Sequence, residues 1–293
     1  MSVTKSLFHQ NLIRLLFLCS LIIQFCIYFM KIINNIIAIF QKELQSYFNS
    51  PLALTIASVF WLISGVFFLF ILFSEEGIIQ NVALQEQLGN TTPRDVPYEF
   101  IQVFFGIMGS ITIFLLPMLS MGLYSEERKR GTIELLATSP VFNWVVALGK
   151  LLGVVVFYIT MIVPILLYEA IAFSTSNPPI PPQVPLLAHL GLILLASAIL
   201  SLGMFISSLT DSTIFSAIIT FILVVFISIL DALTNNLQGA FGQFINQLSV
   251  LKSYEEFVQG IFSTSSFIIF LSYIILGLFL TAQSIETLRF TRK

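Results

Sequence analysis

Side chains that commonly carry out chemistry are scarce in this sequence. It contains two cysteines, Cys19 and Cys26, and two histidines, His9 and His189. Two cysteines cannot build a disulfide framework or a four-ligand zinc site, and only the two histidines could supply imidazole. We therefore expect no metal site and no cofactor in this chain.

Nucleotide hydrolysis and nucleic-acid binding are also disfavoured. A phosphate-binding loop needs an upstream glycine and a Gly-Lys pair followed by Ser or Thr, so that backbone N–H groups and the lysine surround the phosphates. The pair Gly149-Lys150 is followed by Leu151 and lacks that glycine. The net charge of -2 and the absence of a long basic tract argue against nucleic acid as a partner.

The charged residues are densest in one segment, residues 125–140, with the sequence SEERKRGTIELLATSP. Thr132 can cap a new helix, Glu134 would lie in its first turn, where the helix dipole favours an acid, and Pro140 limits its length. A short charged helix held at both ends by longer helices could transmit a push. The same segment could equally be a solvated loop whose charges only fix the topology.

The composition indicates that lipid surrounds most of the chain. Of 293 residues, 57% are hydrophobic and 10% are charged, with 13 basic and 15 acidic side chains. A soluble chain of this length would carry roughly 73 charged residues. So few polar groups cannot cover a soluble domain, and we expect an all-α polytopic membrane protein.

Six stretches are long enough to cross a bilayer as helices, which takes about 20 apolar residues. They are residues 52–73, 100–123, 151–168, 186–209, 213–230 and 267–285, and none contains Asp, Glu, Lys or Arg. An intramembrane enzyme is disfavoured because no span carries paired acids, a metal cluster or an activated nucleophile. An ion-coupled carrier is disfavoured because His189 and the rim residue Glu169 are the only candidate ionisable groups there. We expect His189 to be interfacial and Glu169 to lie at the surface.

The basic residues predict the orientation, since Lys and Arg are retained on the cytoplasmic side. If the start of the first span is cytoplasmic, only Arg94 and Lys252 face outside. The bases on the inner side are then Lys31, Lys42, Arg128, Lys129, Arg130, Lys150, Arg289, Arg292 and Lys293. Both ends of the six-helix unit are therefore predicted to be cytoplasmic.

Residues 1–30 are interpreted as an N-terminal extension that precedes a six-helix domain of residues 31–293. Residues 15–30 are apolar but short for a span, and crossing would place Lys5 and Arg14 outside. The segment also lacks the small-residue cleavage site of a signal peptide. One hypothesis is that translation starts at Met30; the alternative is a weakly anchored or interfacial extension.

Residues 36–48 are predicted to form a helix that lies flat at the cytoplasmic interface. Its apolar side chains at helical spacing are Ile36, Ile37, Phe40, Leu44, Tyr47 and Phe48, and the polar ones opposite are Gln41, Lys42, Glu43, Gln45 and Ser46. Asn49-Ser50-Pro51 should end this helix and turn the chain into the first span. A simple surface anchor and a mechanical role both fit this pattern.

The loop of residues 231–266 is predicted to dip into the outer leaflet as short re-entrant helices. One helical face would carry Phe241, Phe244, Ile245, Leu248 and Leu251, and bends would fall at Gly239, Gly242 and Gly260. Irregular backbone at that depth needs buried protein partners.

The order of these motifs resembles the type-2 permeases of ATP-binding-cassette (ABC) exporters over nearly the whole chain. The motifs are the flat helix, Pro117, Glu126-Glu127, Gly131-Thr132-Ile133-Glu134-Leu135-Leu136, Pro140 and Gly149-Lys150. The later residues 248–251, Tyr254-Glu255-Glu256-Phe257, Gly260 and Leu288-Arg289 are similar to the branch associated with gliding motility and with cytochrome or copper-enzyme maturation. Gly122 departs from the pattern, since many relatives have a basic residue there.

The resemblance implies a six-helix permease that dimerises with a second copy or a paralogue and sits on a separate cytosolic ABC ATPase. ATP and Mg would bind that ATPase, and the location would be a bacterial plasma membrane. In the family, the flat helix and the coupling helix between spans two and three contact the ATPase. The residues that would take this role are Lys42, Glu43, Glu126, Glu127, Arg128, Gly131, Thr132, Glu134, Leu135, Pro140 and Lys150.

Two functions therefore fit the sequence best. The first is an ATP-driven exporter permease that forms the translocation pathway. The second is a membrane scaffold or assembly subunit that recruits an ATPase without moving a substrate. The sequence leaves a lipid, a polysaccharide and a peptide all open as substrates, because lipid-facing Phe side chains account for the 30 phenylalanines without an apolar cargo.

Overall fold

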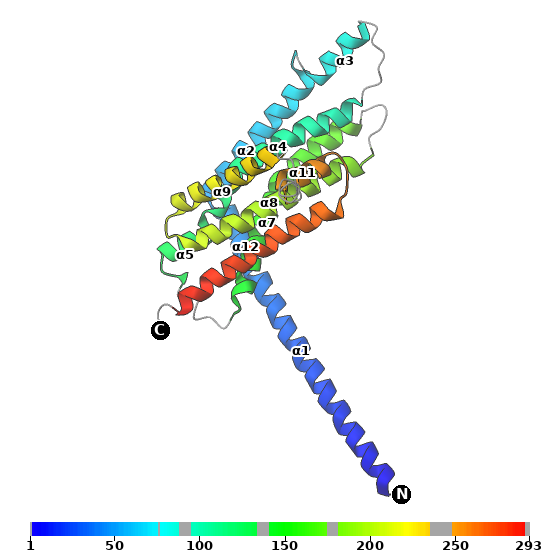
Figure 1. Cartoon of the computed structure of the whole chain (residues 1–293), viewed down its shortest axis with the longest axis vertical. Helices are drawn as coiled ribbons and strands as arrows, with labels where there is room; N and C mark the ends of the chain where they lie inside the picture. The colour runs from blue at the N-terminus through cyan, green and yellow to red at the C-terminus, as the bar shows by residue number, and fades with distance from the viewer. Residues whose placement is uncertain are drawn as a thin grey trace.

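The computed structural model describes residues 2–75, 77–87, 95–133, 141–174, 181–234 and 248–290. Within these ranges the chain is helical and forms no strand, which confirms the predicted all-α class. Six helices are long and apolar enough to cross a membrane. The remaining helices are short or lie across the end of the bundle (Figure 1).

The six predicted spans are all present as helices. They are α2 (Pro51–Phe73), α4 (Val96–Ser120), α7 (Asn143–Ser174), α8 (Gln183–Leu209), α9 (Thr213–Thr234) and α12 (Thr264–Phe290). Most extend beyond the charge-free stretches, because helix continues into the polar residues that flank each apolar run. The short helices are α3 (Ile78–Gln87), α5 (Gly122–Lys129) and α11 (Val250–Val258).

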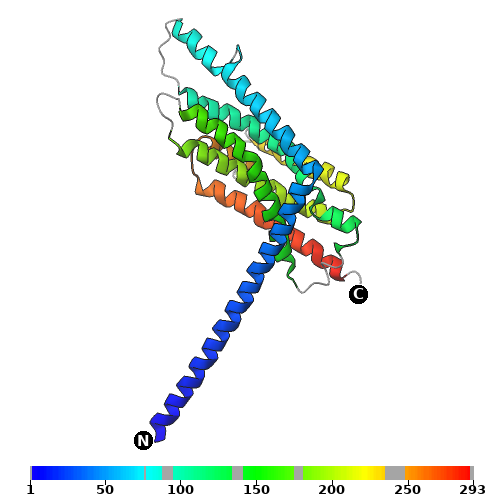
Figure 2. The same cartoon turned by 180° about the vertical axis from the view of Figure 1, so that it is seen from behind.

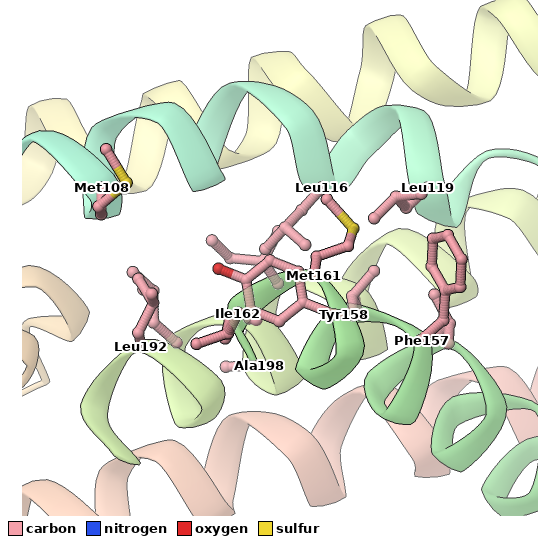
Figure 3. Packing of buried hydrophobic residues seen from close by; sticks show 14 of the residues in the cluster. Met108, Leu116, Leu119, Phe157, Tyr158, Met161, Ile162, Leu192 and Ala198 are labelled. Carbon is pink, nitrogen blue, oxygen red and sulfur yellow. The ribbon is translucent and has the colours of Figure 1, made fainter. Parts of the chain in front are cut away.

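Helix α8 forms the centre of the bundle and packs against α4, α5, α7, α9, α11 and α12. It is the most buried span, whereas few residues of the apolar α9 and α12 are fully buried. Figure 3 shows the core between α4 and α7, where Leu116 and Leu119 lie against Tyr158 and Met161. The exposed faces of the outer helices are apolar, as expected where lipid or another membrane protein covers them.

Most Ser and Thr hydroxyls inside the bundle donate to a carbonyl three or four residues earlier in their own helix, and a smaller set of polar side chains binds across helices. The Trp61 indole of α2 donates to the carbonyl of Met161 on α7 at 2.9 Å. Thr112 of α4 and Tyr158 of α7 share a buried hydroxyl–hydroxyl bond of 2.7 Å. Such bonds fix helix register where apolar contacts alone are non-directional.

Helix α1 (Ser2–Asn49) is a single helix that includes both the N-terminal extension and the predicted helix of residues 36–48. Figures 1 and 2 show its C-terminal part crossing one end of the bundle at a steep angle, while its N-terminal part stands clear of the other helices. It ends as predicted, because Ser50 caps α2 and Pro51 is the first residue of that helix.

At the other end of the bundle, α11 lies within the connection that follows the fifth span. Its side chains Tyr254 and Phe257 are buried against α8, and the Tyr254 hydroxyl donates to the carbonyl of Phe105 on α4 at 2.7 Å. Gly260 ends it with a φ of 74°, in the left-handed region that favours glycine. The helical face predicted from Phe241 to Leu248 lies largely outside the described residues.

Candidate functional site

The charged end of the bundle is organised around Lys150, near the start of α7. Its ammonium group lies 3.4 Å from the Glu43 carboxylate of α1 and 3.0 Å from the Glu127 carboxylate of α5. It also donates to the carbonyl of Leu123 at 2.7 Å and lies over the Tyr124 ring. We call Glu43, Glu127 and Lys150 the Lys150 cluster. The cluster joins three helices that the sequence could only place separately.

The Lys150 cluster is largely buried and links α1, α5 and α7 inside the bundle. Only 4% of the Lys150 side chain is exposed, against 13% for Glu43 and 22% for Glu127. A buried ammonium is tolerated only when it is paired and hydrogen-bonded, and here all three of its N–H donors have an acceptor. Lys150, predicted as a coupling residue at the membrane edge, therefore lies inside the bundle, where it contacts Glu43 and Glu127.

Two glycines bring α1 close enough for this tie. A Cβ atom at Gly149 would meet the Ile39 side chain at 2.8 Å, and one at Gly153 would meet Glu43 at 2.8 Å. Glu43 consequently lies on the face of α1 that packs against α7, and not opposite the apolar face as predicted. Ile37 and Phe48, predicted on the apolar side of this helix, are exposed.

Arg128 of α5 forms a second tie, to the end of α8. Its guanidinium donates to the carbonyl of Ser208 at 2.7 Å and pairs with the Asp211 carboxylate in the turn before α9. An arginine can bind both acceptors because its N–H donors are held in one plane. One hint of this partner is visible in the sequence, since Asp211 is an isolated acid in the short turn between two spans.

Ser207 of α8 supports the chain where α4 gives way to α5. Its hydroxyl accepts from the backbone N–H groups of Tyr124 and Ser125, both at 3.0 Å, and donates to the carbonyl of Met121 at 2.7 Å. Pro117, which has no N–H group, lies one turn earlier in α4. A single buried side chain thus satisfies backbone groups at the helix break. No sequence pattern pointed to Ser207.

We predict that Ser207→Ala destabilises the protein by about 2 kcal/mol, because two buried N–H groups lose their shared side-chain acceptor. The measurement is thermal unfolding of the purified protein in one detergent. Ser110→Ala is the matched control, since that exposed hydroxyl binds only the carbonyl of Gly106 in its own helix. Equal effects of the two changes would contradict the role given to Ser207.

The C-terminal end of α5 is closed by Gly131 and Thr132. Gly131 has a φ of 70°, and its N–H donates to the carbonyl of Arg128. The Thr132 N–H and hydroxyl both donate to the carbonyl of Glu127. The predicted helix of this segment falls on residues 134–140, so Glu134, Leu135 and Pro140 lie outside the described residues and the N-cap role of Thr132 stays a prediction.

Other predicted residues face outward around the same end. Lys42 is 77% exposed and lies 3.9 Å from Glu127, while Glu126 is 55% exposed and pairs with Arg130 at 3.5 Å. Two clefts of about 560 and 610 Å³ flank α5 and share Glu43, Ser46, Gly122, Glu126 and Arg130 in their walls. This surface is polar, accessible and adjacent to the buried tie.

Tyr47 lies in the wall of one cleft and anchors α1 to α4. Its hydroxyl donates to the carbonyl of Leu119 at 2.6 Å. Burial raises the pKa of the Tyr47 phenol well above its usual value, and the nearby Glu43 and Glu126 carboxylates raise it further. Tyr47 therefore stays a neutral hydrogen-bond donor at physiological pH.

Glu169 corrects an expectation from the sequence. It was predicted at the surface, but its side chain is only 2% exposed, and the neighbouring His189, predicted at the membrane interface, is 5% exposed. Glu169 follows the predicted span 151–168 directly and lies in the bundle because α7 continues to Ser174. His189 lies within the predicted span 186–209, and its ring packs against Phe105 of α4 and faces Glu169 of α7. No group of three or more His, Cys, Asp or Glu side chains in the described ranges could hold a metal ion.

Comparison with known families identifies the chain. The family model described as ABC-2 family transporter protein matches residues 17–293. A search of curated proteins found no match. The family match includes all six spans, α5 and most of α1, and it points to a transporter membrane subunit rather than an enzyme. The chain is therefore an integral membrane protein that belongs to the ABC-2 family of transporter proteins.

Proposed function

We propose that this chain is the permease subunit of an ABC exporter, driven by a separate cytosolic ATPase that docks on α1, α5 and the segment after α5. The Lys150 cluster is the observation that carries the proposal. It fixes α1 and α5, which present the exposed charges, to α7, which crosses the membrane. Because the docking surface on α1 and α5 is bonded to α7, a movement of that surface would displace a membrane-spanning helix.

The contacts that α5 makes with α7 and α8 determine which helices would move with it. Glu127 connects α5 to α7 through Lys150, Arg128 connects it to the end of α8, and Ser207 of α8 holds its first turn. Because packed helices shift as rigid units, a movement of α5 would be passed to α7 and α8 together. The break at Met121, between α4 and α5, provides the position where the two helices can change direction.

The remaining parts of the transporter are proposed from the family. ATP and Mg would bind the ATPase, and a second permease copy or a paralogue would complete the pathway. The apolar and exposed α9, which includes Ile214, Phe215 and Ile222, offers a surface for lipid or for that second copy. The excess of bases at the Lys150 end supports a cytoplasmic position for both ends of the six-helix unit, in a bacterial plasma membrane.

The branch is proposed as the one associated with gliding motility and enzyme maturation. The support is the sequence of the outer segment, in which Tyr254 and Phe257 are buried and Glu255 is exposed on α11. Buried aromatic residues there maintain a compact cover over α8.

Co-purification with the cognate ATPase tests the docking surface. We predict that Glu126→Lys together with Lys42→Glu weakens ATPase binding at least tenfold, which is about 1.4 kcal/mol, because complementary charges at an interface become like charges. Both side chains are exposed, so the fold should survive. Glu127 is unsuitable for this test because it holds Lys150.

Glu255→Lys is the matched control, an exposed acid on α11 at the opposite end of the bundle. Binding that resists the first pair of changes, or that falls equally with the control, would refute the assignment. ATP-dependent uptake by inverted vesicles distinguishes the two leading functions. A scaffold subunit would bind the ATPase and show no ATP-dependent transport.

A further inference from the structure

Glu169 of α7 and His189 of α8 are buried together, far from the Lys150 cluster. Glu169 follows Lys150 by 19 residues along α7, roughly 28 Å at 1.5 Å per residue. The Glu169 carboxylate lies 3.7 Å from the His189 ring nitrogen Nδ1. Neither residue takes part in the proposed ATPase contact, so the pair requires its own explanation.

Three polar atoms of this pair have no hydrogen-bond partner within the described part of the chain. They are both carboxylate oxygens of Glu169 and Nε2 of His189. The distance of 3.7 Å is too long for a hydrogen bond between the two side chains. Buried polar atoms are normally hydrogen-bonded, and in a membrane protein a missing partner costs several kcal/mol.

The position of the imidazole protons follows from the backbone. Nδ1 of His189 lies 2.8 Å from the carbonyl of Pro185, which can only accept, so Nδ1 carries the hydrogen. Nε2 then needs no proton and presents a lone pair. A neutral ring is the less costly state here, because an imidazolium would be buried beside Phe105, whose ring meets it edge-on at 4.8 Å.

An ionised Glu169 would be costlier still. A buried carboxylate needs donors or a counter-charge, and neither contacts its oxygens within the described residues. One proton removes the charge. We propose that Glu169 and His189 form a proton-binding site in which the Glu169 carboxyl takes up a proton from water on the outer side and His189 stays neutral.

The Glu169–His189 site is separated from α11 by Phe105. Phe105 of α4 connects the two, since its ring contacts His189 and its carbonyl accepts from the Tyr254 hydroxyl at 2.7 Å. Gly191 of α8 also lets Phe257 approach closely, because a Cβ there would meet Phe257 at 2.6 Å. Release of the proton would put a negative charge under this packed layer, which loosens α11 from α8.

Other titratable groups surround the site at this end of the bundle. They are Tyr98 and Glu99 of α4, Tyr158 and Tyr168 of α7, Asp231 of α9, Lys252, Tyr254, Glu255 and Glu256 of α11, and Tyr273 of α12. Burial raises the pKa of Tyr254 well above its usual value, and Tyr158 and Glu169 raise it further. Glu256 accepts a hydrogen bond from Ser266, and Glu255 is exposed. Lys252 is the one base among these groups; its side chain is exposed, and within the described residues no ion pair joins it to Glu169, whose nearest charged-group contact there is His189.

Infrared difference spectroscopy of the purified full-length protein tests proton occupancy. The C=O stretch of a protonated carboxyl group is separate from that of a carboxylate. We expect a protonated-carboxyl band at neutral pH that decreases at alkaline pH, is lost in Glu169→Gln and is unchanged in the exposed control Glu255→Gln. The absence of the band from the wild-type protein, or its survival in Glu169→Gln, would overturn the proposal.

Hydrogen exchange of the α11 backbone amides tests the consequence. After correction for the intrinsic pH dependence of exchange, the amides of residues 250–258 should lose protection as Glu169 ionises. Glu169→Gln, which imitates the neutral acid, should keep protection constant across the same range. Stability should likewise fall with rising pH in the wild-type protein only, because the folded state alone holds the proton. Equal behaviour of both proteins in exchange and stability would refute the site.

Discussion

Replacing Lys150 by Met is expected to destabilise the protein by about 3–5 kcal/mol and to uncouple it from the ATPase proposed above. The change keeps a long apolar side chain but leaves the Glu43 and Glu127 carboxylates buried without their shared cation. It also removes the donor that binds the carbonyl of Leu123. The measurements are thermal unfolding in detergent and stimulation of ATPase activity by the purified permease.

A triple variant separates the effect of unpaired buried charges from the effect of losing the ionic bonds between α1, α5 and α7. Lys150→Met combined with Glu43→Gln and Glu127→Gln removes the unpaired charges, so most of the lost stability should return. Coupling should stay impaired, because neutral side chains no longer hold α1 and α5 to α7 by ionic bonds. A single Lys150→Met variant with wild-type stability would show that Lys150 is solvated. Recovery of both properties in the triple variant would assign the cluster to folding alone.

Gly277→Val is expected to lower the free energy of unfolding by about 3 kcal/mol. Gly277 of α12 faces α8, where a Cβ would lie 2.5 Å from the Ser201 hydroxyl and 2.6 Å from a backbone carbon of Ser201. A side-chain atom could rotate away, but the backbone of the central helix cannot. The substitution therefore separates α12 from α8, a strain that typically costs a few kcal/mol.

Gly65→Val provides the matched control for this prediction. Gly65 also lies inside an apolar span, α2, but a Cβ there has no neighbour within 4 Å. Thermal unfolding of both variants in the same detergent should show a large decrease for Gly277→Val and little change for Gly65→Val, since only the first meets another backbone. A similar decrease in the two variants would mean that the β-branched side chain, and not the helix contact, causes the loss.

Much of the fold could be predicted because the signals are local. A charge-free apolar run of about 20 residues in lipid satisfies its backbone hydrogen bonds within itself by forming a helix. All six spans followed from this rule, and the end of α1 followed from Ser50 and Pro51. The charged segment around Glu126 and Glu127 was identified in the same way, from composition and spacing.

The candidate site was predicted less completely because its members are far apart in sequence. Lys42, Glu43, Glu127 and Lys150 were each identified, but nothing in the sequence indicated that Glu43 and Glu127 share one lysine. Ser207 was missed because a lone serine in an apolar helix has no pattern. Which face of α1 packs depends on Gly149 and Gly153 of another helix, which is why Glu43 was assigned to the wrong side.

The sequence by itself determined the solvent of this protein, the number of its spans and the end of the molecule at which its charges gather. These properties depend on the transfer of each segment from water to lipid, which composition sets. Only the tertiary structure decided that Lys150 is a buried tie and that Glu169 and His189 share an internal site. Those results depend on how each helix is rotated against its neighbours, and that rotation is set by side-chain packing between distant segments.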